Sequence, residues 1–314
     1  MNLSVDIGKL KLKNPVTVAS GTFGYAEEFA DLLDLKSLGA IVTKTITLKS
    51  REGNAMPRII ETSAGILNAI GLQNEGLDNF LKVKLPLLKL LGTKIIVSIS
   101  AENAADFILM AGKLENAGVE AIELNLSCPN IEYSMDNNSP QSGTGQKIKI
   151  FAQDCEAVFS LIKALRKKTN LVLIAKLSPN VTDISAIARS AEDAGADALS
   201  LVNTFLGMAV DIENCCPKLA NITGGLSGPA IKPLALRMVY ETARVVSIPV
   251  IGMGGIINAA DALEFIIAGA AAVGIGTANF VNPKVSLEII KGLEDYLQRK
   301  NFADINQIRG TLKI

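Results

Sequence analysis

One short segment of the chain combines a thiol, two amide side chains and a proline. Residues 123–130 read Glu-Leu-Asn-Leu-Ser-Cys-Pro-Asn. The alternating residues 121–126 predict a buried strand, and Pro129 prevents that strand from continuing. Cys128 and Asn125 are therefore expected at the C-terminal end of a strand, where β/α barrels carry their catalytic groups. The alternative interpretation is that the cysteine is a small buried residue and the asparagines form a turn.

The composition excludes several other kinds of chemistry. The chain has 314 residues, no histidine, four cysteines and no Cys-x-x-Cys pair. Histidine-dependent nucleophile systems are therefore excluded, and we expect neither a metal site nor an iron–sulfur cluster. The 31 basic and 31 acidic residues cancel, so we expect no binding to nucleic acid or to a membrane surface. Redox chemistry would need a bound organic cofactor.

Three features of the sequence favour a cytoplasmic protein. Residues 1–15 lack a basic segment followed by an apolar one, as a signal peptide would have. The longest apolar stretch, residues 268–275, is too short to span a bilayer. The cysteines, including the adjacent Cys215 and Cys216, are unsuited to a disulfide framework.

Apolar runs that alternate with segments of helical periodicity predict the fold. We expect strands at residues 16–19, 40–43, 95–98, 121–126, 171–176, 198–202, 249–252 and 272–276. The intervening helices include residues 104–117, 154–168, 185–194, 231–246, 259–268 and 285–299. Eight strand–helix units predict an α/β fold, a (β/α)8 TIM barrel, as a single domain over residues 1–314 with insertions in the loops at its C-terminal face. No Gly-x-Gly-x-x-Gly turn follows a strand, which argues against a dinucleotide-binding fold.

Three glycine-rich segments predict a ligand that carries a phosphate. Gly254-Gly255 precedes a helix expected near Asn258, and Gly276-Thr277 follows the eighth strand. Residues 224–228 form a third glycine-rich segment, interpreted as a loop before a helix at Pro229. Glycines allow a phosphate to approach backbone N–H groups, and barrels commonly hold phosphates after strands seven and eight.

Two lysines end predicted strands, Lys44 and Lys176. One interpretation is that each extends to solvent at the rim of the barrel. The other is that they stabilise negative charge on a reduced flavin and on an acidic substrate.

Motifs along nearly the whole chain resemble dihydroorotate dehydrogenase of class 1, most closely the class 1B catalytic subunit. These motifs are Ser20-Gly21-Thr22, Thr43-Lys44-Thr45, Met56-Pro57-Arg58, Asn68–Asn74, Asn125–Asn130, Lys176–Asn180, Asn203–Val210, Gly224–Ile231 and Gly252–Ile256.

The resemblance implies FMN-dependent oxidation of (S)-dihydroorotate to orotate in de novo pyrimidine (UMP) biosynthesis. It makes Cys128 the general base that removes the C5 proton, while hydride passes from C6 to flavin N5. The positions that it assigns to FMN are Ser20, Lys44, Thr45, Ser98, Asn125, Lys176, Val202, Gly228, Gly254, Gly255, Gly276 and Thr277. Those that it assigns to the substrate are Lys44, Asn68, Ala69, Ile70, Gly71, Leu72, Asn125, Asn203 and Thr204.

The resemblance also implies partners. We expect a homodimer, alone or within a heterotetramer with a subunit that carries FAD and an iron–sulfur cluster and passes electrons to NAD. A class 1A enzyme would instead use fumarate alone. Two other functions stay open: a related flavin barrel that acts on neutral dihydropyrimidines, similar to dihydropyrimidine dehydrogenase, and a phosphate-binding barrel without redox chemistry, such as an aldolase-like lyase.

Two segments depart from the family pattern. Residues 131–148 are longer than usual and polar, and they form either a lid over the substrate or a surface insertion with a local role. Cys215 and Cys216 stand where the family usually has charged or polar residues, and we interpret them as incidental loop cysteines.

The assignment of Cys128 gives a prediction about pH. A thiol has a pKa of about 8.5, so flavin reduction by substrate should accelerate as the pH rises through that value. Stopped-flow measurement of flavin reduction between about pH 6 and 10 tests this, and a rate independent of pH would contradict it. Cys128→Ala should retain FMN and lose most turnover. Cys128→Ser should be slow because a hydroxyl is a much weaker base.

Overall fold

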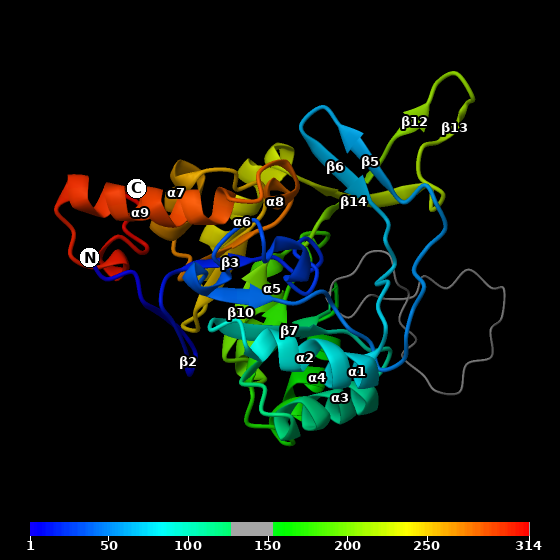
Figure 1. Ribbon diagram of the computed structural model, residues 1–314, viewed down its shortest axis with the longest axis horizontal. Helices are drawn as coiled ribbons and strands as arrows, with labels where there is room; N and C mark the ends of the chain where they lie inside the picture. The colour runs from blue at the N-terminus through cyan, green and yellow to red at the C-terminus, as the bar shows by residue number, and fades with distance from the viewer. Residues whose placement is uncertain (127–152, 314) are drawn as a thin grey trace.

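A closed barrel of eight parallel strands forms the centre of the protein, shown as a computed structural model that describes residues 1–126 and 153–313 (Figure 1). Its strands are, in chain order, β3 (Val16–Val18), β4 (Ala40–Val42), β7 (Lys94–Ile99), β8 (Ala121–Asn125), β9 (Val172–Lys176), β10 (Ala198–Leu201), β15 (Val250–Met253) and β16 (Ala272–Ile275). β16 pairs with β3 and closes the barrel. The predicted TIM barrel is confirmed, and every predicted strand end lies within one residue of the observed end.

The barrel strands form from nearly continuous apolar runs, which can be buried on both faces of the sheet. No residue of β8 or β9 is exposed, as expected for parallel strands that lie between a packed interior and a layer of helices. Polar residues stand at the C-terminal ends of these strands, where Asn125 ends β8 and Lys176 ends β9. Because all eight strands run parallel, the side chains that follow them lie at one face of the barrel.

Helices follow most of the barrel strands. They are α1 (Leu77–Asn79), α2 (Leu85–Lys89), α3 (Ala104–Asn116), α4 (Cys155–Arg166), α5 (Ile184–Asp193), α6 (Lys232–Ala243), α7 (Ala259–Ile267), α8 (Ala278–Val281) and α9 (Val285–Lys300). Side chains of Asn103, Asp154, Asp183 and Asn258 accept backbone N–H groups at the N-termini of α3, α4, α5 and α7, and so fix where these helices begin.

The first expected strand–helix unit lacks its helix. Between β3 and β4 the chain forms only two short 3-10 turns, η1 (Glu27–Phe29) and η2 (Leu35–Ser37). Ala26 has a φ of 70°, which interrupts any right-handed helix at this point. The stacked rings of Phe23 and Phe29, 3.8 Å apart, pack this segment against the core instead.

Two insertions in the loops at the C-terminal face combine into an antiparallel sheet. One insertion follows β4 and forms β5 (Ile59–Thr62) and β6 (Gly65–Asn68), while the other follows β10 and forms β11 (Phe205–Met208) and β14 (Thr223–Ser227). The strand order is β11-β14-β6-β5, and a short hairpin, β12 (Val210–Asp211) with β13 (Cys216–Pro217), projects beyond it (Figure 1).

The glycine-rich segment 224–228 differs from its prediction. It was interpreted as a loop, but residues 224–227 belong to β14, which pairs with β11 on one side and β6 on the other. Glycine is required there because neighbouring strands come close: a Cβ on Gly224 would lie 2.7 Å from the carbonyl oxygen of Asn68. Gly228, just past the strand, begins the turn into α6 with a φ of 101°.

The opposite end of the barrel is covered by an N-terminal hairpin. Its strands are β1 (Val5–Ile7) and β2 (Leu10–Leu12), whose inward residues are fully or almost fully buried. The turn at Gly8 contacts Asp197, immediately before β10 begins. Among the described residues, no helix is long and apolar enough to cross a membrane.

The packing of β14 gives a prediction about stability. An added Cβ on Gly225 would lie 2.0 Å from Oγ1 of Thr204, so Gly225→Ala should lower the free energy of unfolding by about 1–3 kcal/mol. The control is Gly112→Ala in α3, where nothing lies within 4 Å of the new methyl group; it should raise stability by about 0.5–1 kcal/mol. Urea unfolding of both variants tests this. Equal stabilities of the two variants would refute the packing argument.

Candidate active site

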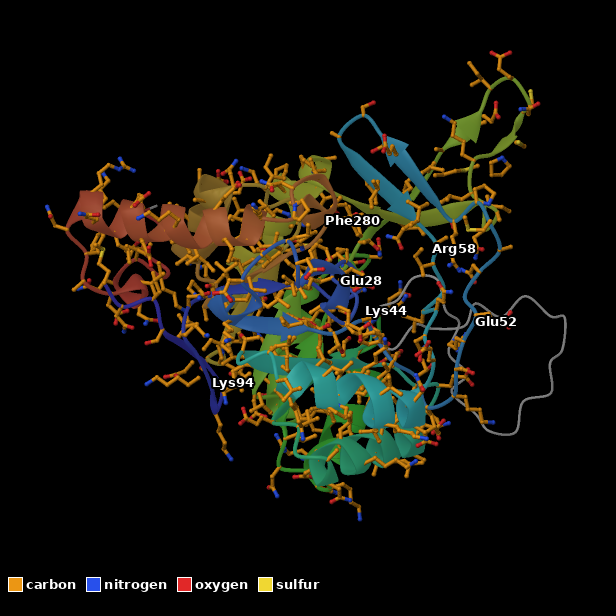
Figure 2. All side chains as sticks on the ribbon, in the orientation of Figure 1. Glu28, Lys44, Glu52, Arg58, Lys94 and Phe280 are labelled. Atoms are coloured by element: carbon orange, nitrogen blue, oxygen red, sulfur yellow. The ribbon has the colours of Figure 1, made fainter. Side chains whose placement is uncertain are left out.

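A cavity of about 540 Å³ lies at the C-terminal ends of the barrel strands. Its walls include residues that follow the strands, such as Lys44 after β4, and residues of the antiparallel sheet, such as Asn68 and Ser227. Figure 2 shows Lys44, Arg58 and Phe280, all of which line the cavity, on the side of the barrel nearest that sheet. The two insertions therefore supply one wall of the cavity and the barrel supplies the other.

Most of the positions predicted to contact FMN line this cavity. They are Ser20, Lys44, Thr45, Asn125, Lys176, Val202, Gly228, Gly254, Gly255, Gly276 and Thr277. Ser98 is the exception, since it is fully buried beneath the cavity and does not line it.

Most of the positions predicted to hold the substrate also line the cavity. They are Lys44, Asn68, Ile70, Gly71, Leu72, Asn125, Asn203 and Thr204. Ala69 does not line it; this residue is fully buried in a small second core with Leu67 and Leu219. The predicted base Cys128 and the polar segment 131–148 lie outside the described residues.

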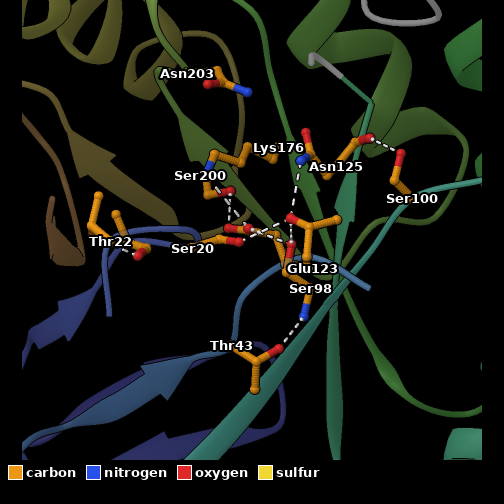
Figure 3. Close-up of polar contacts among 12 residues, drawn as sticks. Ser20, Thr22, Thr43, Ser98, Ser100, Glu123, Asn125, Lys176, Ser200 and Asn203 are labelled. Atoms are coloured by element: carbon orange, nitrogen blue, oxygen red, sulfur yellow. Dashed lines mark hydrogen bonds and ion pairs between the residues drawn. The ribbon is translucent and has the colours of Figure 1, made fainter. Parts of the chain in front are cut away.

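A chain of hydroxyl groups crosses the floor of the cavity (Figure 3). Oγ1 of Thr45 lies 2.9 Å from the hydroxyl of Ser20 and 2.9 Å from that of Ser98. The same oxygen accepts a hydrogen bond of 3.1 Å from Nδ2 of Asn125. Oδ1 of Asn125 is buried and has no partner among the described residues. Because an unpaired buried carbonyl is costly, this oxygen is suited to accept a hydrogen bond from a ligand.

Beneath this floor lies a buried carboxylate whose role was not predicted. Glu123 is 1% exposed, and its carboxylate accepts hydrogen bonds from Ser98 at 3.2 Å and Ser200 at 2.9 Å. Its other partner is Lys176, whose Nζ lies 3.6 Å from Oε1 of Glu123. Lys176 is only 4% exposed, so the interpretation that it extends to solvent is wrong. The available signal was a glutamate within an otherwise apolar predicted strand.

Two further cationic side chains line the cavity, Lys44 and Arg58. Burial lowers the pKa of Lys44, the nearby Arg58 guanidinium lowers it further, and Glu28 opposes both effects. Arg58 donates hydrogen bonds to the carbonyl oxygens of Glu52 and Asn54, which fix it at the start of β5. Sequence reasoning had placed Arg58 only within a family motif.

The two glycines after β15 combine an unusual backbone with unpaired donors. Gly254 and Gly255 have φ values of 128° and 74°, and a Cβ at these positions would lie 2.6 Å from Ala235 and 2.8 Å from Lys232. No described residue accepts a hydrogen bond from either N–H group. Nearby, the hydroxyl of Thr277 donates a hydrogen bond of 2.8 Å to that of Ser227, which links the ends of β14 and β16. Backbone donors thus gather where a barrel commonly holds a phosphate.

No group of three or more Cys, Asp or Glu side chains among the described residues is arranged to hold a metal ion. The cavity instead offers amides, hydroxyls and cations, which suit an organic ligand that carries negative charge.

Comparisons with known proteins agree along the whole chain. Residues 2–297 match the family described as dihydroorotate dehydrogenase. The chain is 51% identical over 314 residues to the dihydroorotate dehydrogenase B (NAD(+)) catalytic subunit of Thermoanaerobacter sp. strain X514, with all of both chains covered. Proteins with the same name from Desulforamulus reducens and Trichlorobacter lovleyi are each 51% identical, over 99% of this chain and 98% of their own length.

The environment of Lys44 gives a prediction about stability and pH. Its pKa in the folded protein lies below the ordinary value of 10.5, so the unfolded chain binds this proton more tightly and the wild type is penalised at lower pH. Lys44→Met should therefore raise the urea midpoint of the ligand-free protein at pH 7. The gain should shrink as the pH approaches 10.5.

The control for this measurement is Lys9→Met, because Lys9 is an exposed lysine distant from the cavity. Its midpoint should match that of the wild type across the same pH range. A midpoint of Lys44→Met below the wild type at pH 7 would show that contacts of this side chain outweigh its electrostatic penalty.

Proposed function

This chain belongs to the dihydroorotate dehydrogenase family, and we propose from this membership that it is the catalytic subunit of a class 1B enzyme. Its reaction is the oxidation of (S)-dihydroorotate to orotate in de novo pyrimidine biosynthesis. The observation that carries the proposal is the charge of the cavity. Lys44, Arg58 and Lys176 line it, and no Asp or Glu among the described residues does so. This charge favours an acidic substrate together with an anionic cofactor.

We propose FMN as the cofactor, and the residues present fit it. The unpartnered N–H groups of Gly254 and Gly255, with Gly276 and Thr277, would hold its phosphate. The unpartnered Oδ1 of Asn125 matches the N–H edge of a flavin ring or of the substrate. A bound flavin supplies the acceptor for the two electrons removed from the substrate. We also propose that residues 1–314 form a single FMN-binding domain.

The substrate would lie against Lys44 and the asparagines. The dihydropyrimidine ring alternates N–H donors and C=O acceptors, and the amides of Asn68, Asn125 and Asn203 offer both kinds of partner. Lys44 and the backbone of residues 70–72 would receive the substrate carboxylate, and Arg58 adds positive charge beside them.

Cys128 remains the proposed general base. β8 ends at Asn125, which lines the cavity, and Cys128 follows three residues later in the sequence.

For partners we propose a homodimer that assembles with an electron-transfer subunit. The relatives are named as catalytic subunits of an NAD(+)-linked enzyme, a name that implies another subunit. The described part of this chain contains one barrel and no separate dinucleotide-binding sheet, so electrons would reach NAD through FAD and an iron–sulfur cluster on that partner.

A neutral dihydropyrimidine is the alternative substrate, and the cavity argues against it. Such a ring has no carboxylate to pair with Lys44 and Arg58, and desolvating these charges in a partly buried site without pairing them is costly.

An anaerobic titration tests the proposed function. Dihydroorotate should bleach the visible absorbance band of the bound flavin, whereas dihydrouracil, its analogue without the carboxylate, should not. Neither NAD nor fumarate alone should restore the band, and NAD should restore it once an electron-transfer subunit is added. Bleaching by dihydrouracil but not by dihydroorotate would contradict the proposal, and recovery with fumarate alone would assign the chain to a class 1A-like activity.

A further inference from the structure

The ion pair between Lys176 and Glu123 is asymmetric with respect to the cavity. Lys176 lines the cavity, whereas Glu123 lies behind it in the barrel interior and does not. The two residues stand on adjacent strands, β9 and β8, and both side chains are at least 94% buried. Any ligand in the cavity therefore meets the ammonium group first and the carboxylate behind it.

The contacts of Glu123 hold its carboxylate in one place. Ser98 on β7 donates to one oxygen and Ser200 on β10 donates to the other, so strands on both sides fix its orientation (Figure 3). Lys176 is its cationic partner, at 3.6 Å from Nζ. This distance exceeds that of a hydrogen bond, so the N–H groups of Lys176 remain able to donate to a ligand.

The position of this pair also links it to the floor of the cavity. The hydroxyl of Ser98 touches both Glu123 and Thr45, and Thr45 in turn contacts Ser20 and Asn125, which line the cavity. Ser98 thus connects the carboxylate of Glu123 to Thr45 in the cavity wall. In an interior of low dielectric constant, such a fixed charge acts strongly on its surroundings.

We propose that Glu123 is a positioning residue for Lys176 that also offsets part of its charge, and thereby sets how strongly the cavity stabilises negative charge on a reduced flavin. The inference rests on the proposed function, because it takes the ligand to be a flavin. Without the carboxylate, the Lys176 ammonium would act unopposed on the flavin. Without the ammonium, the buried carboxylate would disfavour the reduced, negatively charged form.

The test compares the flavin midpoint potentials of Glu123→Gln and Lys176→Met with that of the wild type. Glutamine keeps the size of the side chain and removes its charge. Glu123→Gln should raise the ratio of reduced to oxidised flavin at a fixed potential by about tenfold, which equals ~30 mV for a two-electron couple. Lys176→Met should shift the potential in the opposite direction. Glu123→Asp keeps the charge and should lie closer to the wild type than Glu123→Gln.

Shifts of the midpoint potential in opposite directions would distinguish this role from a purely structural one. If the pair only stabilised the fold, both variants would lower the unfolding midpoint of the apoprotein while leaving the potential unchanged or shifting it in the same direction. A potential of Glu123→Gln equal to that of the wild type would overturn the inference. Should that variant fail to fold, Lys176→Met is compared with Lys176→Met/Glu123→Gln, in which both charges are removed together. The inference requires the double variant to have the higher potential, and equal potentials would overturn it.

The potentials are measured with a chemical reductant, so the result does not depend on the substrate. A wild-type protein that binds no flavin, or whose flavin dihydroorotate cannot reduce, would refute the proposed function. A flavoprotein that reacts with dihydroorotate but shows no opposite shifts would refute only the role of Glu123.

Discussion

Closure of the parallel barrel is the constraint on which the rest of the structure depends. Each of the eight strands is paired on both sides, so the sheet has no open edge and its backbone groups are satisfied. The strands must be buried on both faces, which requires nearly continuous apolar sequence. Polar side chains that could contact a ligand therefore stand where the strands end, as Asn125 and Lys176 do. The cavity lies where it does because all these ends are on one face.

The second wall of the cavity comes from contacts between distant parts of the sequence. β6 and β14 pair directly, and Nδ2 of Asn68 donates to the carbonyl of Gly225, 157 residues further along the chain. Local patterns could not reveal this sheet, because β14 reads Thr-Gly-Gly-Leu-Ser and glycine usually marks a turn. Its glycines instead allow neighbouring strands to approach, as the position of Thr204 beside Gly225 shows. The barrel was predictable because its strands are local apolar runs, whereas the sheet depends on tertiary pairing.

The candidate site was predictable to the extent that its residues follow barrel strands. Lys44, Asn125 and Gly254 lie within two residues of the ends of predicted strands, and all three line the cavity. The resemblance assigns Ser98 to the cofactor and Ala69 to the substrate, but both residues are fully buried and neither lines the cavity. The role of Glu123 was not predicted, because this residue lies inside a strand. Periodicity there predicts burial and packing, and it does not indicate the role of a charged side chain. Register across β7, β8 and β9 is what brings Glu123 to Ser98 and Lys176.

The charge at this site is set by the residues around the cavity, because the chain as a whole has no net charge. Its formal net charge is zero, so long-range attraction cannot concentrate an anionic substrate. The cavity itself presents three cations and, among the described residues, no acid. Such a cluster is costly in a partly buried site, and the lowered pKa of Lys44 shows part of that cost. Glu123 compensates Lys176 from behind the wall, where it adds no acidic group to the surface that a ligand touches. The barrel interior thereby lets the site remain cationic toward its ligands while the buried charge stays paired.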